Sequence, residues 1–270
     1  MNRKRMIKWG LSFSLMFLAA CSDSQANETN DLDQQNDEAT EQVETDTDTE
    51  ENQKNIDFVV VEDAAGNSVE VPFDPQRVAV FDNGQLDNMA AIGMEDRVVV
   101  TASPNLPAHL SQYNDVEVAG SFFEIDLEVT HAADPDLIIV AGRSSAAYDD
   151  LSAIAPTIDL SHDAQNYLDS IGQNLSRYAE FFAIEDQVAE ITNELEEKLK
   201  MLNEKAENSD VTTLMTMYNE GSLSAYGEGS RYGVIYDAFG FKPVDDEIES
   251  TNHGMEISNE YLLSENPDVI

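Results

Sequence analysis

The sequence predicts an α/β protein with two lobes of similar architecture that are joined by a long helix. Three observations support this class. Strand-like apolar runs alternate with helical segments from residue 56 onward, an amphipathic stretch covers residues 163–206, and one short motif recurs in both halves. Strands that alternate with helices favour a parallel sheet covered by helices on both faces.

The first predicted lobe covers residues 56–162. Residues 58–61 and 68–72 alternate around a turn at 64–67 and predict a hairpin. Asp126 has the residue type of an N-cap and predicts a short helix that ends near residue 133. The further strands are predicted at 77–81, 98–100, 137–140 and 156–160, with a helix after 82–84.

Residues 163–206 are predicted to connect the lobes. Apolar residues recur there at helical spacing, and a break at 183–186 divides the stretch into two helices, of which the second is long. A helix that pairs with a coiled-coil partner is the competing interpretation, but its heptad seam is imperfect. Strand and helix signals return at 211–218 and 234–239, within a second lobe assigned to residues 207–270.

An internal repeat, called the internal echo below, relates the two halves of the sequence. Glu128 lies seven residues before Pro135-Asp136, and Glu260 lies seven before Pro267-Asp268, 132 residues later. The residues Asp126 and Ser258, both N-cap types, keep the same offset. Each half is therefore expected to hold a capped helix, a Pro-Asp turn and a buried strand. Because the second apolar run stops at Ile270, we expect the C-terminal lobe to be incomplete.

The first 55 residues differ from the rest. Residues 1–20 have a basic start and a short apolar run, which is typical of a secretory signal. That run ends at Cys21, the single cysteine of the chain, in a sequence that resembles the bacterial lipobox. We expect diacylation of Cys21, and two acyl chains make a lasting anchor. Residues 21–55 are acidic and of low complexity, which predicts a disordered tether.

Composition excludes several classes of protein. The 270 residues include 54 acidic and 14 basic side chains, for a formal net charge of −40. So acidic a chain has no electrostatic footprint for nucleic acid. One cysteine excludes an internal disulfide framework and a cysteine-based zinc site.

Four stretches carry a family resemblance. They are VFDNGQLD at 80–87, DPDLIIVAGR at 134–143, SAYGEGSRYG at 224–233 and TNHG at 251–254. In order and at these separations they resemble the catecholate and petrobactin receptors among the iron-siderophore-binding lipoproteins of ABC importers. The resemblance covers residues 56–270 and implies two Rossmann-like lobes in the class III periplasmic-binding-protein arrangement.

The implied ligand is a ferric siderophore with net negative charge, so a receptor needs permanent cations. Arg143 directly follows a predicted strand, where ligands of open α/β sheets bind, and Arg231 lies in a Gly/Ser-rich loop. The competing interpretation of each arginine is a surface ion pair. His253 is implied as a direct iron ligand for siderophores that fill four of six iron sites; otherwise it is an exposed loop histidine. We interpret His109, His131 and His162 as ordinary histidines.

Other residues complete the predicted site. The backbone N–H groups of Asn83, Gly84 and Gln85 could meet a ligand oxygen, unless they form a plain strand–helix turn. Tyr226 and Tyr232 could stack on a catechol ring, or pack in the core.

The family resemblance also implies partners and a location. It implies that Glu128 and Glu260 dock on an ABC permease, although the helix dipole alone explains their positions. It further implies a monomer outside the cytoplasm, anchored by lipid to a cell membrane of Gram-positive type, with no cofactor of its own.

The sequence is also compatible with competing functions. The same fold could bind haem, cobalamin or a hydroxamate siderophore, although paired arginines favour a more anionic ligand than the last two. An adhesive or structural lipoprotein would not require Arg143, Arg231 and His253 to converge. Nothing favours an exported hydrolase, because the sequence has no Gly-x-Ser-x-Gly elbow and no predicted metal triad. We therefore predict a binding protein and no enzyme.

Overall fold

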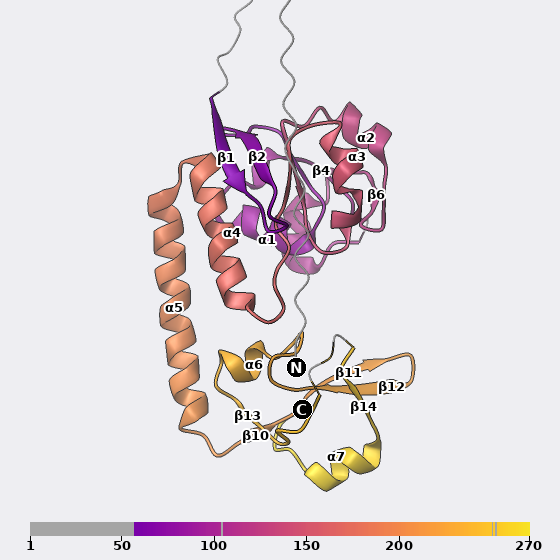
Figure 1. Cartoon of the computed structure of the whole chain (residues 1–270), viewed down its shortest axis with the longest axis vertical. Coiled ribbons are helices and arrows are strands. Elements are labelled where there is room, and N and C mark those ends of the chain that lie inside the picture. The colour runs from indigo at the N-terminus through magenta and orange to yellow at the C-terminus, as the bar shows by residue number, and fades with distance from the viewer. Residues whose placement is uncertain (1–56, 104, 250, 252) are drawn as a thin grey trace, which may run out of the picture. The chain divides into compact units, whose positions relative to one another are not determined.

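The structure is a computed structural model that describes residues 57–103, 105–249, 251 and 253–270. The predicted signal peptide, Cys21 and the acidic tether lie outside the described residues. The chain from Asp57 onward is shown in Figure 1 with its helices and strands.

The predicted N-terminal hairpin is present. Strand β1 (Phe58–Glu62) pairs antiparallel with β2 (Ser68–Pro72). Asp63 fixes the turn, because its Oδ1 accepts hydrogen bonds from the backbone N–H groups of Ala65 and Asn67 at 3.0 and 2.8 Å. The other carboxylate oxygen accepts the N–H of Asp159 at 3.1 Å and so ties the hairpin to the main sheet.

The main sheet has five parallel strands in the order β5-β4-β3-β8-β9. The strands are β3 (Val78–Val80), β4 (Val98–Thr101), β5 (Glu117–Val118), β8 (Leu137–Val140) and β9 (Thr157–Asp159). All the residues of β3, β8 and β9 are buried. This continuous burial explains the unbroken apolar runs that predicted them, because parallel strands are covered on both faces.

Side chains of the central strands alternate between two cores. Val78 and Val80 join a cluster with helix α1 (Asn83–Ala91), while Ala79 joins a cluster with helix α3 (Tyr148–Ser152). Successive residues of a strand point to opposite faces, so each face has its own helices. The remaining short elements of this lobe are η1 (Glu95–Arg97), η2 (Ala108–Tyr113), β6 (Gly120–Ser121), β7 (Glu124–Ile125), α2 (Leu127–Ala132) and η3 (Ser144–Ala147).

Two helices follow the N-terminal sheet, as predicted. Helix α4 (Tyr167–Phe182) ends at Ala183, whose left-handed φ of 55° terminates it, and α5 (Glu185–Glu207) begins directly afterwards. Gln187 donates to the backbone carbonyl of Ile92 at 2.8 Å, and Asn203 donates to that of Ala238 at 3.3 Å. Helix α5 therefore touches both the N-terminal lobe and the segment after residue 207.

The C-terminal segment contains a parallel pair and an antiparallel sheet. Strands β10 (Thr212–Thr213) and β13 (Lys242–Pro243) are parallel. The antiparallel sheet has the order β11-β12-β14. Its strands are β11 (Met215–Asn219), β12 (Ser222–Tyr226) and β14 (Met255–Ile257), and the segment also holds helices α6 (Val234–Asp237) and α7 (Asn259–Glu265).

The strand signal at 211–218 corresponds to two strands, β10 and β11, with Leu214 between them. The N–H of Leu214 donates to the carbonyl of Val269 at 2.9 Å, whereas the N–H of Met215 donates to the hydroxyl of Tyr236 at 2.8 Å. Thr213 pairs with Pro243 of β13 and Met215 pairs with Tyr226 of β12, so the chain leaves one sheet and enters another at this point. Apolar and threonine-rich residues suit both sheets equally, so the sequence pattern does not mark the change.

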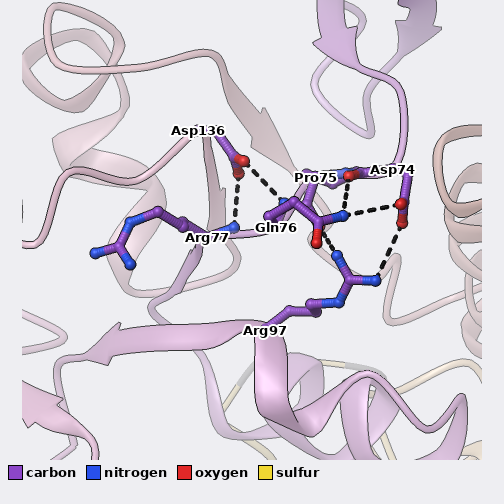
Figure 2. A network of polar contacts seen from close by, with 6 residues as sticks. All are labelled: Asp74, Pro75, Gln76, Arg77, Arg97 and Asp136. Carbon is purple, nitrogen blue, oxygen red and sulfur yellow. Dashed lines mark hydrogen bonds and ion pairs between the residues drawn. The ribbon is translucent and has the colours of Figure 1, made fainter. Parts of the chain in front are cut away.

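The internal echo has a structural basis in both lobes. In Figure 2 the carboxylate of Asp136 accepts the backbone N–H groups of Gln76 and Arg77, at 2.8 and 3.0 Å. Asp268 likewise accepts the backbone N–H of Thr212 at 2.9 Å. The following residues then pair in parallel with the first strand of a parallel sheet, Leu137 with Val78 of β3 and Val269 with Thr213 of β10.

The helix before each turn also conforms to the prediction. The side chain of Asp126 caps α2, and that of Ser258 caps α7. Both Asp134 and Asn266, directly before the prolines, have a left-handed φ of 48°. The repeated capped helix and Pro-Asp turn are confirmed, while the expectation that the C-terminal lobe is incomplete stays a prediction. Among the described residues no helix has the length and apolar character needed to cross a bilayer.

Candidate functional site

Three neighbouring strands of the main sheet end at the same edge. Asp82 follows β3, Gly142 and Arg143 follow β8, and His162 follows β9. Since the strands are parallel, their carboxyl ends lie together, which is where open α/β sheets bind ligands. Polar and charged side chains from three separate segments are thereby brought to one place.

A cavity of about 500 Å³ lies at this edge. It has one wall from the N-terminal lobe, a second from the start of α4 and a third from the loop that leads into α6. The lining residues are Asp82, Ala141, Gly142, His162, Ala164, Tyr167, Arg231, Tyr232 and Val234.

Arg231 brings a positive charge to the cavity wall. Its guanidinium lies over the ring of Tyr232, 5.1 Å from the ring centroid. Tyr232 in turn meets the buried ring of Tyr226 edge-on at 4.8 Å. Tyr226 is thus a core residue in this structure, while Tyr232 lies between the core and the cavity. The aromatic contact holds Arg231 in one orientation.

Arg143 is exposed and is not itself part of the cavity lining, although its charge acts on the lining residue Asp82. Its neighbour Gly142 lines the wall, and its guanidinium lies 5.5 Å from the ring centroid of Phe123, in the turn between β6 and β7. Phe123 is itself 81% exposed, so an aromatic ring supports this arginine at the surface. Each of the two predicted arginines is therefore paired with an aromatic ring.

His253 is exposed, in a turn before β14, and is not part of the cavity lining. Its neighbour Gly254 packs against Tyr226, because a Cβ at Gly254 would lie 3.0 Å from Cε2 of that ring. The turn is therefore connected to the cavity through Tyr226 and Tyr232. Of the three residues predicted to converge, Arg231 lines the cavity, Arg143 directly follows the lining residue Gly142, and His253 lies outside the lining.

The segment from Asn83 to Gln85 forms the start of α1. The N–H groups of Gly84 and Gln85 donate to Oδ1 of Asp82, at 2.8 and 3.1 Å, so the N-cap already uses them. The Gln85 side chain is fully buried and donates to the carbonyl of Leu160 at 2.9 Å. It also accepts the hydroxyl of Tyr178 at 3.0 Å. Gln85 therefore connects α1 to the segment after β9 and to α4 within the core, next to the site.

The cavity lining also includes a carboxylate and an imidazole outside the set of predicted site residues. Asp82 belongs to the VFDNGQLD motif without a predicted role of its own, and the prediction that His162 is an ordinary histidine does not account for its place in the lining. Both directly follow buried strands at the carboxyl edge, which is the same signal that selected Arg143. Applied to every strand, that rule finds all three residues.

Burial controls the protonation of both groups. Desolvation raises the pKa of Asp82, against the backbone hydrogen bonds of Gln85 and Gly84 and the weaker effects of His162 and Arg143. Desolvation lowers the pKa of His162, and the nearby charge of Asp82 partly opposes this. His162 is therefore held neutral, with its ring 5.3 Å from that of Tyr167.

Comparison with known proteins identifies the family. Residues 78–270 match the family model described as periplasmic binding protein. The chain belongs to this family. The class III fold and the family predicted from the sequence are both confirmed.

Several proteins similar to this chain are named for the ligands that they bind. The chain is 36% identical over 206 residues to the petrobactin-binding protein YclQ of Bacillus subtilis, covering 76% of this chain and 65% of that protein. The chain is 30% identical to the ferric-anguibactin-binding protein FatB of Vibrio anguillarum, over 78% of this chain and 67% of that one. The match thus spans about two thirds of each relative's length.

Solved structures agree with the sequence relatives. The crystal structure of YclQ superposes with a TM-score of 0.76 at 35% identity, covering 79% of this chain and 77% of that one. The catecholate-siderophore-binding protein VctP of Vibrio cholerae gives a TM-score of 0.72 at 32% identity, over 78% and 76% of the two chains.

The two glutamates predicted to contact a permease lie in the first turns of two helices. Glu128 is in α2 and lines a separate open hollow with residues of α3, including Asp149 and Asp150. Glu260 is in α7, where the backbone hydrogen bond of its own N–H and the side chain of Ser258 lower its pKa. Both carboxylates are exposed.

The described residues contain no group of three or more His, Cys, Asp or Glu side chains suited to a metal ion. Arg231 and Arg143 are suited to an anionic ligand, because guanidinium groups bond planar oxygens through a fork and stay charged.

Proposed function

We propose that this chain is the solute-binding component of an ABC importer, which captures a ferric siderophore of catecholate or petrobactin type. The cavity at the carboxyl edge of the parallel sheet receives the chelate, and a permease then accepts it. The names of YclQ and VctP support the ligand class. A helix rather than flexible strands connects the lobes, so the proposal expects only small lobe motion.

The observation that carries this proposal is the arrangement of arginines at the cavity. The body from residue 56 onward has 42 acidic and nine basic side chains. Two of those nine lie at or beside one cavity, and each is set against an aromatic ring. In so acidic a protein, cations gathered at one edge favour an anionic ligand.

The proposal gives the other predicted residues their roles. His253 is a direct ligand to iron when the siderophore leaves two coordination positions open, since imidazole suits iron. Tyr232 faces the ligand, and Asn83, Gly84, Gln85 and Tyr226 support the wall behind it.

Cellular placement is also part of the proposal. A diacylated Cys21 anchors the protein outside the cytoplasmic membrane, and the acidic tether holds the body away from the lipid surface. Glu128 and Glu260 then contact basic residues of the permease, and the receptor acts as a monomer. The family consists of solute-binding proteins, which accords with a role in capture and none in catalysis.

Titration of the mature protein with three iron complexes tests the function. Ferric petrobactin and a ferric tris-catecholate should bind, and a neutral ferric trihydroxamate should bind at least about tenfold more weakly. The single tryptophan is Trp9, within the predicted signal peptide, so the assay follows tyrosine emission or ligand absorbance. Tightest binding of the hydroxamate complex, or of haem or cobalamin titrated alongside the three, would reject the ligand class. No binding of any complex would favour a structural or adhesive lipoprotein.

A further inference from the structure

The cavity wall formed by the N-terminal lobe is rich in hydrogen-bond acceptors. Asp82 and His162 line this wall, and Tyr167 at the start of α4 adds an aromatic face. The positive charge on the lining comes from the opposite wall, at Arg231. The cavity is therefore bipolar, with a cationic side and an acceptor side.

One carboxylate oxygen of Asp82, Oδ2, has no hydrogen-bond partner among the described residues. Its Oδ1 accepts two backbone N–H groups and caps α1. No hydrogen bond to Oδ2 and no ion pair to Asp82 occurs within the described part of the chain. A carboxylate that only capped the helix would not need to face a cavity built for an anion, where it repels the ligand.

Two further acceptors beside Asp82 are unsatisfied. Within the described residues, Nδ1 of His162 and Oδ1 of Asn83 are buried with no hydrogen-bond partner. Buried polar atoms are nearly always paired, so the unpaired Nδ1 of His162, a residue of the cavity lining, points to a missing donor. The neutral imidazole offers a lone pair to that donor, and the amide oxygen of Asn83, next to Asp82 in the sequence, is a further unpaired acceptor.

We infer that this wall binds a protonated amine carried by the siderophore. The inference rests on the proposed function and specifies the ligand further, as an anionic iron chelate with an ammonium group in its backbone. The carboxylate of Asp82 accepts the ammonium N–H, and the ring of Tyr167 supplies a cation–π face. A carboxylate with an aromatic face is a usual environment for a bound ammonium ion.

The alternative role for Asp82 is to act as a counter-ion for Arg143. The positions of the side chains argue against it as the main role. Arg143 is exposed and lies over Phe123, and none of the ion pairs among the described residues joins it to Asp82. The two charges interact at a distance, and Oδ2 remains available to a ligand.

The test compares two synthetic ferric bis-catecholates that differ in one linker atom. One linker has a secondary amine, protonated at neutral pH, and the other has a methylene in its place. The wild type should prefer the amine chelate on the order of tenfold, because one charge-assisted hydrogen bond is gained. Asp82→Asn should reduce the preference to less than about twofold, and it keeps the helix cap because asparagine is an equally good N-cap.

Two further variants complete the design. Asp87→Asn removes the same charge from an exposed position of α1 and should keep the preference. Tyr167→Leu should reduce the preference while both chelates still bind, and it does not depend on the cap. An unchanged preference in Asp82→Asn, or no preference in the wild type, overturns this inference alone. Failure of the wild type to bind either chelate overturns the proposed function as well.

Discussion

Asp136 and Asp268 occupy equivalent positions in two copies of one turn. Each follows a proline, and each accepts a backbone N–H at the start of a parallel strand: Asp136 at the residues just before β3, and Asp268 at Thr212 of β10. The two aspartates are 132 residues apart in the sequence. Both lobes therefore use a carboxylate to join a short capped helix to the central parallel strands.

Removal of this carboxylate should destabilise the N-terminal lobe. Asp136→Ala leaves the N–H groups of Gln76 and Arg77 without their acceptor, so the free energy of unfolding should fall by about 1–2 kcal/mol. Urea denaturation measures the change. Asp149→Ala, at an exposed position of α3, is the matched control and should change stability by less than about 0.5 kcal/mol. Equal stability of both variants would contradict the account of the turn.

Gly254 should not tolerate a side chain. Its φ is +74°, and a Cβ there would lie 2.8 Å from the carbonyl oxygen of Ala225. Gly254→Ala should therefore cost about 2–3 kcal/mol of unfolding free energy, from strained backbone and from overlap. Gly221→Ala separates the two causes, because Gly221 also has a positive φ, of +92°, but nothing within 4 Å of a Cβ. It should cost about 1 kcal/mol. Equal thermal shifts of the two variants would show that the overlap has no effect.

His162 should make the protein sensitive to mild acid. Its pKa is lowered by burial, so the unfolded chain takes up a proton at a higher pH than the folded protein does. Stability is therefore lost as the pH falls through the ordinary histidine value, near 6.5. His162→Gln should lose less stability than the wild type between pH 7.5 and 5.5, in denaturant titrations at each pH. His109→Gln, at an exposed position, should behave as the wild type does. A His162→Gln profile parallel to that of the wild type would contradict this role.

His253 should matter only for some chelates. The ferric complex of a tetradentate bis-catecholate leaves two positions on iron, which an imidazole can fill. His253→Ala should weaken that complex at least about tenfold, because even outer-shell changes at metal sites have effects of this size. It should leave binding of a hexadentate tris-catecholate unchanged, and the visible absorbance of the bound bis-catecholate should shift. His109→Ala controls for the loss of an exposed imidazole. Equal losses for both chelates would reject direct coordination.

The sequence predicted most of the N-terminal lobe because its signals are local. Unbroken apolar runs identify β3, β8 and β9, and N-caps such as Asp126 identify helix starts. The exchange of sheets at Leu214 could not be predicted in this way, since it depends on the distant Val269 and Tyr236. Tertiary partners decide such positions, and residue type alone does not.

The candidate site was predicted less completely than the fold. Position after a strand selected Arg143, and the same criterion would have selected Asp82 and His162. The contribution of Gln85 could not be foreseen, because its partners Leu160 and Tyr178 come from other segments. A polar residue after a strand can face a ligand or the core, and only the packing decides between them.

The most direct test of the central claim is the affinity of the Arg143→Ala, Arg231→Ala double variant for an anionic ferric catecholate, measured by titration. The account predicts a loss of about 100-fold or more, because two guanidinium groups near one cavity no longer meet the negative chelate. The Lys198→Ala, Lys200→Ala variant removes equal charge from the exposed surface of α5 and should bind like the wild type. Equal affinity of the double arginine variant and the wild type would contradict the account.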